Sequence, residues 1–145
     1  MGFFKSSKSH VEILDQECRL IMQQAADVRE RCDRSLRGKY ENMQPEDRAA
    51  LLKEAGALQK KLHATLTSAR EREHLMTQDQ CPSEDILTAH SRLLEAALDV
   101  GRADKSLEDA RQSLLAGMHE IEQFYGPKSK EARQVRKVLD DLQAS

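Results

Sequence analysis

The sequence predicts an all-α fold in which a long antiparallel helical hairpin is followed by a three-helix C-terminal unit. Only three prolines and six glycines interrupt 145 residues, and the stretches between them are rich in strong helix formers. Apolar residues recur at alternating spacings of three and four, the period of an amphipathic helix. Aromatic residues make up only 3% of the chain, and Trp is absent. We therefore expect one domain with a thin aliphatic core.

The hairpin is expected over residues 9–79. Its first helix spans about 9–38, and its apolar positions follow three heptads: Val11, Leu14, Cys18, Ile21, Ala25, Val28 and Cys32. Pro45 suits the first turn of the second helix, which runs to about Gln78. A matching apolar pattern follows: Leu51, Ala55, Leu58, Leu62, Thr65 and Ala69. The short connection favours folding back within one chain, although the same heptads also fit a coiled coil between chains.

The C-terminal unit, residues 82–145, is expected to hold three helices. Ser83 is a good N-cap for the first, whose predicted inward positions are Ile86, His90, Leu93, Ala97 and Val100. Gly101 fits the position after a helix end, and a further helix begins at Asp104. Gly126-Pro127 ends that helix, and Ser129 caps the last one, whose predicted inward positions are Ala132, Val135, Leu139 and Leu142.

Charge and motif content argue against several classes of function. The formal net charge is −2, from 23 basic and 25 acidic residues that are mixed along the chain. This pattern gives no basic face for nucleic acid. The histidines and cysteines lack metal-ligand spacing, and no phosphate-binding loop motif is present. We expect no catalytic residue, no cofactor and no bound metal.

The first eight residues are expected to form a flexible N-terminal segment. Met1-Gly2 with Ser6 fits the pattern for N-myristoylation at Gly2. A single acyl chain would support only weak, reversible membrane contact. No secretory signal is evident, and the three cysteines form no recognisable framework. We therefore expect a cytoplasmic setting, with cytoskeletal or peripheral-membrane association as alternatives.

Three stretches carry a family resemblance: "DVGR", "SLEDARQSLL" and "FYGPKSKEA". Residues 82–143 resemble a tetratricopeptide-type helix pair, of the kind found in kinesin light chains and in the C-terminal regions of SET/MYND-type methyltransferases. The resemblance implies a hairpin turn at Gly101, a helix end at Gly126-Pro127, and packing positions at Leu107 and Ala110. It also implies a partner-binding groove, lined by Arg92, Glu95 and Asp99.

The last helix carries a local basic strip formed by Lys130, Arg133, Arg136 and Lys137. The strip either complements acidic residues on the neighbouring helix or contacts an acidic partner. Taken together, the sequence predicts a non-enzymatic scaffold or adaptor that presents a helical surface to a protein partner. A myristoylated membrane tether and a self-assembling, homo-oligomeric coiled-coil component of the cytoskeleton remain the alternatives.

Overall fold

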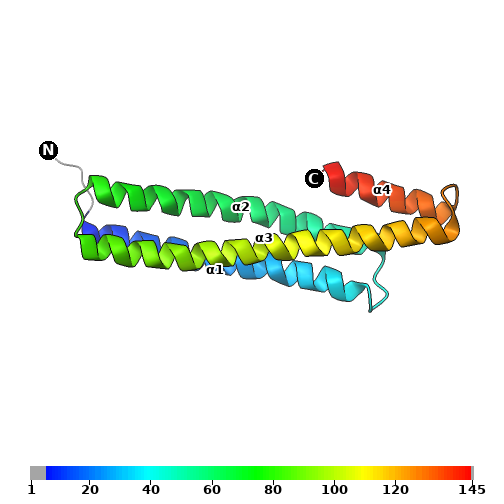
Figure 1. The fold of residues 1–145 in the computed structure, drawn as a ribbon, viewed down its shortest axis with the longest axis horizontal. Coiled ribbons are helices and arrows are strands. Elements are labelled where there is room, and N and C mark those ends of the chain that lie inside the picture. Colours follow the sequence, from blue (N-terminus) through cyan, green and yellow to red (C-terminus); the bar gives the residue numbers. More distant parts are fainter. Residues whose placement is uncertain (1–5, 145) are drawn as a thin grey trace. The chain divides into compact units, whose positions relative to one another are not determined.

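The computed structural model describes residues 6–144 as four helices: α1 (Ser7–Gly38), α2 (Pro45–Gln78), α3 (Ser83–Tyr125) and α4 (Lys130–Ala144) (Figure 1). Within these residues no strand occurs, so the predicted all-α class is confirmed. Contacts divide the chain into two units that cut across the helices. Unit 1 combines residues up to Ala26 with Gln59–Arg102, and unit 2 combines Asp27–Leu58 with the residues from Ala103 onward. This division does not follow the sequential halves 9–79 and 82–145.

The apolar pattern of α1 marks its buried face as predicted. Val11 is half-buried, whereas the remaining predicted positions are all buried: Leu14, Cys18, Ile21, Ala25, Val28 and Cys32. Helix α1 begins at Ser7, two residues before the predicted start. The Ser6 hydroxyl accepts a hydrogen bond from the Ser9 backbone N–H at 3.1 Å, which caps the helix.

Unit 1 packs segments of three helices, and its ion pairs establish their directions. His10 and Glu17 of α1 pair with Asp79 and Arg72 of α2, respectively, so the two helices run antiparallel. Asp15 of α1 pairs with Arg92 of α3, and Ser7 is hydrogen-bonded to Asp85, which makes α1 and α3 parallel. Within this unit α1 and α2 therefore fold back on each other, as the hairpin prediction required.

Unit 2 repeats the antiparallel pairing of α1 and α2 and fixes it with a buried arginine. Arg48 Nε donates to the Ser35 carbonyl oxygen at 2.8 Å, and the Ser35 hydroxyl donates to the Arg48 carbonyl oxygen at 3.2 Å. Burial lowers the pKa of Arg48. The guanidinium lies at the C-terminal end of α1, where helix carbonyls favour a positive charge. Because Gly38 lacks a side chain, the connection to α2 approaches closely: an added Cβ would lie 2.9 Å from Met43 Cβ.

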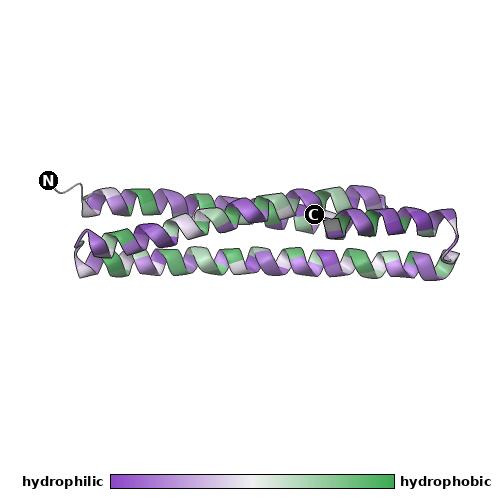
Figure 2. Cartoon of the chain, turned by 90° about the horizontal axis from the view of Figure 1, so that it is seen from above, coloured by the Kyte–Doolittle hydropathy of each residue, from purple (hydrophilic) through white to green (hydrophobic). Residues whose placement is uncertain are grey.

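The predicted break at Gly101 is wrong. Helix α3 runs unbroken from Ser83 to Tyr125, as Figure 2 also shows, so the region from residue 82 holds two helices instead of three. Small and branched residues alternate along its buried side at spacings of four and three, without a gap at Gly101. We call this set the inner stripe: Ala89, Leu93, Ala96, Val100, Ala103, Leu107, Ala110 and Leu114. Because this register passes through Gly101, packing on both sides of the glycine outweighs its poor helix propensity.

The C-terminal helix follows a tight connection in unit 2. Gly126 has a φ of +86° and its N–H donates to the Glu122 carbonyl oxygen at 2.9 Å, the arrangement of a glycine helix end. The Ser129 hydroxyl accepts from the Ala132 N–H at 3.1 Å, so the predicted cap of α4 is present. Figure 1 shows α4 folding back along α3. Ala132 and Val135 of α4 are buried as expected. The predicted positions Leu139 and Leu142 are only half-buried, and Val138 is buried instead.

Candidate protein-interaction surface

An apolar stripe faces solvent on the part of α3 that belongs to unit 1. Its members, which we call the outer stripe, are Leu87, Leu94 and Leu98, with exposed fractions of 66%, 54% and 62%. Their spacings of seven and four keep them on one helix face. Leu94 and Leu98 each lie two residues from the buried Ala96, which places them about 160° from it at about 100° per residue. The outer stripe is therefore on the side of α3 opposite the inner stripe.

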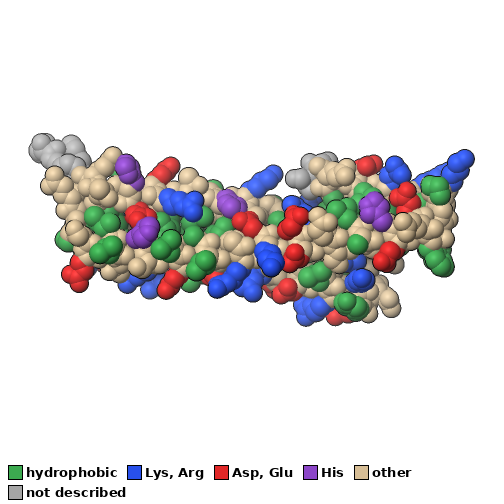
Figure 3. All heavy atoms as spheres, in the orientation of Figure 1, with side chains coloured by type: hydrophobic (Ala, Val, Ile, Leu, Met, Phe, Trp, Pro, Cys, Tyr) green, Lys and Arg blue, Asp and Glu red, His purple; other side chains and the backbone are tan. Residues whose placement is uncertain are grey.

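The surface view shows the same concentration of apolar groups. In Figure 3, hydrophobic side chains gather over the N-terminal part of α3. Elsewhere in unit 1 the exposed leucines are isolated: Leu20 lies on α1 and Leu75 on α2. Scattered exposed leucines are normal on protein surfaces, whereas aligned ones mark interaction sites. The outer stripe is thus the most distinctive apolar feature of this unit.

The predicted groove residues lie to one side of the outer stripe on α3 and differ in their bonding. Arg92 pairs with Asp15 of α1. Asp99 Oδ1 accepts from Arg102 Nη1 at 2.8 Å within α3. Glu95 is exposed beside Leu94. The hairpin turn that would have shaped a groove at Gly101 is absent. These three residues consequently line no groove; they lie on one continuous helix, to one side of the leucines.

The predicted basic strip lies entirely on α4. Lys130, Arg133, Arg136 and Lys137 are all exposed. Arg136 Nη2 lies 3.3 Å from Glu122 Oε1 of α3, within unit 2. An exposed pair of this kind is typically worth less than about 1 kcal/mol. At Arg136, therefore, the basic strip complements a neighbouring acidic residue, as one of the two interpretations of the sequence required.

The candidate lipidation residue Gly2 lies outside the described residues. Ser6, which completes the same pattern, is described and caps α1. No helix within the described part of the chain combines the length and apolar character needed to cross a membrane.

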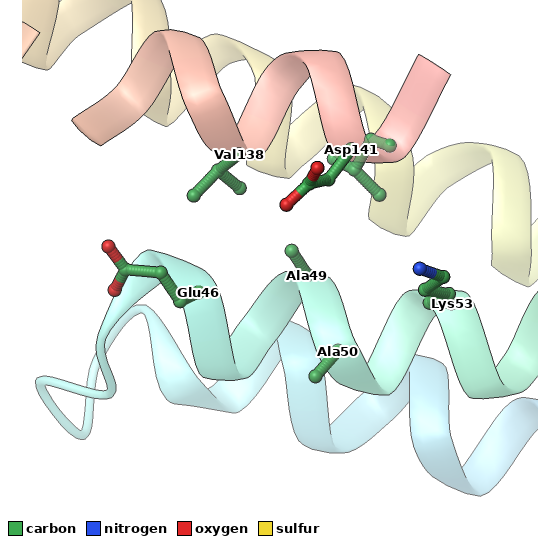
Figure 4. A pocket seen from close by; sticks show the side chains of 7 residues that line it. Glu46, Ala49, Ala50, Lys53, Val138 and Asp141 are labelled. Atoms are coloured by element: carbon green, nitrogen blue, oxygen red, sulfur yellow. The ribbon is translucent and has the colours of Figure 1, made fainter. Parts of the chain in front are cut away.

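The cavity in Figure 4 lies between α2 and α4 of unit 2. Its volume is about 220 Å³, and Ala49 and Val138 form part of its apolar wall. Glu46 and Lys53 project from α2, and Asp141 points toward the gap from α4. Pockets for drug-sized ligands usually measure at least about 300 Å³. The gap follows from small side chains on α2, and its mixed charges do not define one ligand chemistry.

The cysteines behave as small buried apolar residues. Cys18, Cys32 and Cys81 are free and buried. Burial is the main cause that raises the pKa of Cys32 to about 11; Asp33 raises it further, whereas Arg111 opposes the shift. Burial likewise raises the pKa of Cys18. Among the described residues, no group of three or more His, Cys, Asp or Glu side chains is arranged to hold a metal ion.

His90 lies on the exposed side of α3, contrary to the prediction. It was expected on the inward face of α3, yet it is exposed, and its Nδ1 lies 2.6 Å from Glu73 Oε1 of α2. The buried position is Ala89. The inward face of α3 is therefore rotated by one residue from the predicted one at this point. The sequence prediction did not single out Leu87, Leu94 and Leu98, although their spacing of seven and four is the signal of a second apolar face on the same helix.

Comparison with known proteins adds no family assignment. No family model matches the chain, and neither a curated protein nor a solved structure matches it.

Proposed function

We propose that this protein is a helical interaction module that uses the outer stripe of α3 to bind a partner helix. The observation that carries the proposal is the alignment of Leu87, Leu94 and Leu98 on a solvent-facing side of a helix whose opposite side is already buried. An apolar helix face with anchors at heptad spacing suits helix-to-helix recognition. The role is that of a scaffold or adaptor, in agreement with the class predicted from the sequence.

Charged side chains beside the outer stripe support a selective role. Glu95 and Arg102 are exposed next to the leucines. In helix pairing, flanking charges select the partner and its direction, while the apolar anchors supply most of the affinity. Three free, buried cysteines further support a reducing, intracellular setting for this role.

The test compares two surface variants with equal chemistry and different positions. Leu94→Ser with Leu98→Ser removes two anchors of the outer stripe, and Leu20→Ser removes an exposed leucine of α1. All three side chains are exposed, so both variants should keep the helicity of the parent protein. Tagged proteins are expressed in the native cell, and co-purified proteins are quantified by mass spectrometry.

We expect partners to fall by at least about tenfold with the double variant, which is the effect of losing about 1.4 kcal/mol of binding free energy. The Leu20→Ser protein should retain them. If the double variant keeps the same partners at the same amounts while circular dichroism shows it folded, the outer stripe is not the interaction surface.

A further inference from the structure

The outer stripe has opposite charges at its two ends, so it is complementary to an inverted copy of itself. Glu84 lies three residues before Leu87, and Arg102 lies four residues after Leu98, so opposite charges stand at the two ends of one apolar segment. Both charged side chains are exposed, Arg102 to 62%. All of these residues belong to unit 1. A helix with such ends matches a second copy of itself when that copy runs in the opposite direction.

We propose that a second copy of this chain occupies the outer stripe, with the two α3 segments antiparallel about a two-fold axis near residues 92 and 93. In this register Leu87 of each copy faces Leu98 of the other. Leu94 of each copy faces the other's Ser91, whose small side chain leaves room for the leucine. This inference rests on the proposed function and names the partner that the interaction surface takes.

Charge determines the direction of the pair. In the antiparallel register Glu84 of each copy lies opposite Gly101 of the other and therefore beside Arg102 at both ends, and Glu95 lies near Thr88. A parallel pair would instead place Glu84, Glu95 and Arg102 beside their own counterparts. Like charges that face each other across a helix pair disfavour that arrangement. The two-fold axis also gives a closed dimer, because each interface is formed by the same patch on both copies.

The size of the surface predicts weak association. Only three leucines per copy take part, over about three helical turns, so the buried area should be at or below the roughly 1,200 Å² lower limit of standard interfaces. A dissociation constant on the order of micromolar to tens of micromolar follows for such a contact. The dimer should therefore appear and disappear within an accessible concentration range.

Sedimentation velocity of the full chain from about 1 µM to about 500 µM tests the association. We expect a shift from monomer to dimer across this range. Leu98→Glu should keep the protein monomeric throughout, because it places an acid against the other copy's Leu87. Leu20→Glu on α1 is the matched control and should dimerise as the parent does. A monomer at every concentration, or a dimer that survives Leu98→Glu, would overturn the inference.

A charge exchange tests the register itself. Glu84→Arg alone and Arg102→Glu alone should each raise the dimer dissociation constant by about tenfold, because each turns two attractive pairs into two repulsive ones. The double variant restores opposite charges across the interface and should return to within about threefold of the parent value. If both single variants weaken the dimer and the double variant does not recover, the antiparallel register is wrong. Circular dichroism of each variant confirms that helicity is kept.

Different results would contradict the proposed interaction surface and the proposed dimer. Sedimentation could show only monomers while the Leu94→Ser, Leu98→Ser double variant still loses its cellular partners. In that case the outer stripe is an interaction surface, but it binds a different protein. If neither experiment responds to the outer stripe, both proposals fall.

Discussion

Gly101→Ala should stabilise the protein, because Gly101 lies inside a helix and does not end one. It is the nineteenth residue of α3, which continues to Tyr125. Its φ is not among the positive values of the chain, and it is exposed. Apart from its chain neighbours and the adjacent backbone of α3, a Cβ at this position meets no atom within 4 Å. The added methyl group therefore causes no clash and fills no cavity, which leaves the backbone effect alone.

The free-energy change caused by that backbone effect has been measured in helical peptides and proteins. Replacing Gly by Ala in an exposed helix interior gains about 1 kcal/mol, since Ala restricts the unfolded chain more strongly. For a chain of this size we expect the melting temperature to rise by about 2–4 °C. Urea unfolding followed by far-UV circular dichroism measures the free energy of unfolding. A protein concentration near 1 µM keeps the proposed dimer dissociated.

Gly126→Ala is the matched control with the opposite sign. Gly126 has a φ of +86°, a conformation in which Ala is strained, so this variant should lose about 1 kcal/mol. If Gly101 ended a helix, as the tetratricopeptide resemblance implies, Gly101→Ala would behave like Gly126→Ala. A loss of stability at both positions would refute the continuous α3 and restore the hairpin turn.

Four further outcomes follow from the described contacts and from the sequence. Gly38→Ala should lower the free energy of unfolding by about 1–2 kcal/mol, because the new methyl would lie 2.9 Å from side-chain atoms of the following connection; urea unfolding checks this. Burial raises the pKa of Cys32 from 9.0 to about 11, so the unfolded thiol ionises first and stability falls as pH rises from about 9 to about 11, by up to about 3 kcal/mol; Cys32→Ala should flatten that part of a pH series. Arg136→Gln breaks an exposed pair with Glu122 and should change stability by less than about 0.5 kcal/mol. If Gly2 is acylated, Gly2→Ala should shift the protein from membrane to soluble fractions; an unchanged distribution would remove the lipid-tether alternative.

The sequence was sufficient for the parts of the fold in which apolar spacing has one interpretation. In α1 the heptad positions from Leu14 to Cys32 keep an unbroken alternation of three and four, whereas neighbouring apolar residues such as Ile13 and Leu20 do not continue a second series, so the buried face follows from the spacing. Pro45 and Ser129 mark helix starts for reasons local to the chain, and both predictions hold. Local chemistry and a single apolar face were enough in these segments.

In helix α3 the apolar spacing alone does not identify the buried face. Its N-terminal half carries apolar residues on two opposite faces, and its buried face is formed partly by alanines such as Ala89 and Ala96. Alanine gives a weak hydrophobic signal, so the predicted face included His90 and Ala97 in place of the buried Ala89 and Ala96. The unbroken register from Val100 to Ala103 was the signal that would have corrected the break at Gly101. A glycine alone does not distinguish a helix end from an exposed helix interior, because its meaning depends on the packing around it.

The same ambiguity gives the outer stripe its significance. A heptad of leucines has the same sequence pattern whether its face is buried within the chain or against another molecule. Within unit 1, α1 and α2 already cover the inner stripe from Ala89 to Val100, and Leu87, Leu94 and Leu98 remain exposed. Isolated leucines such as Leu20 need no partner, since single exposed apolar residues are common. Three leucines in register, bounded by Glu84 and Arg102, instead have the pattern of one half of a helix pair, and the charge-exchange variants determine whether the other half is the same chain.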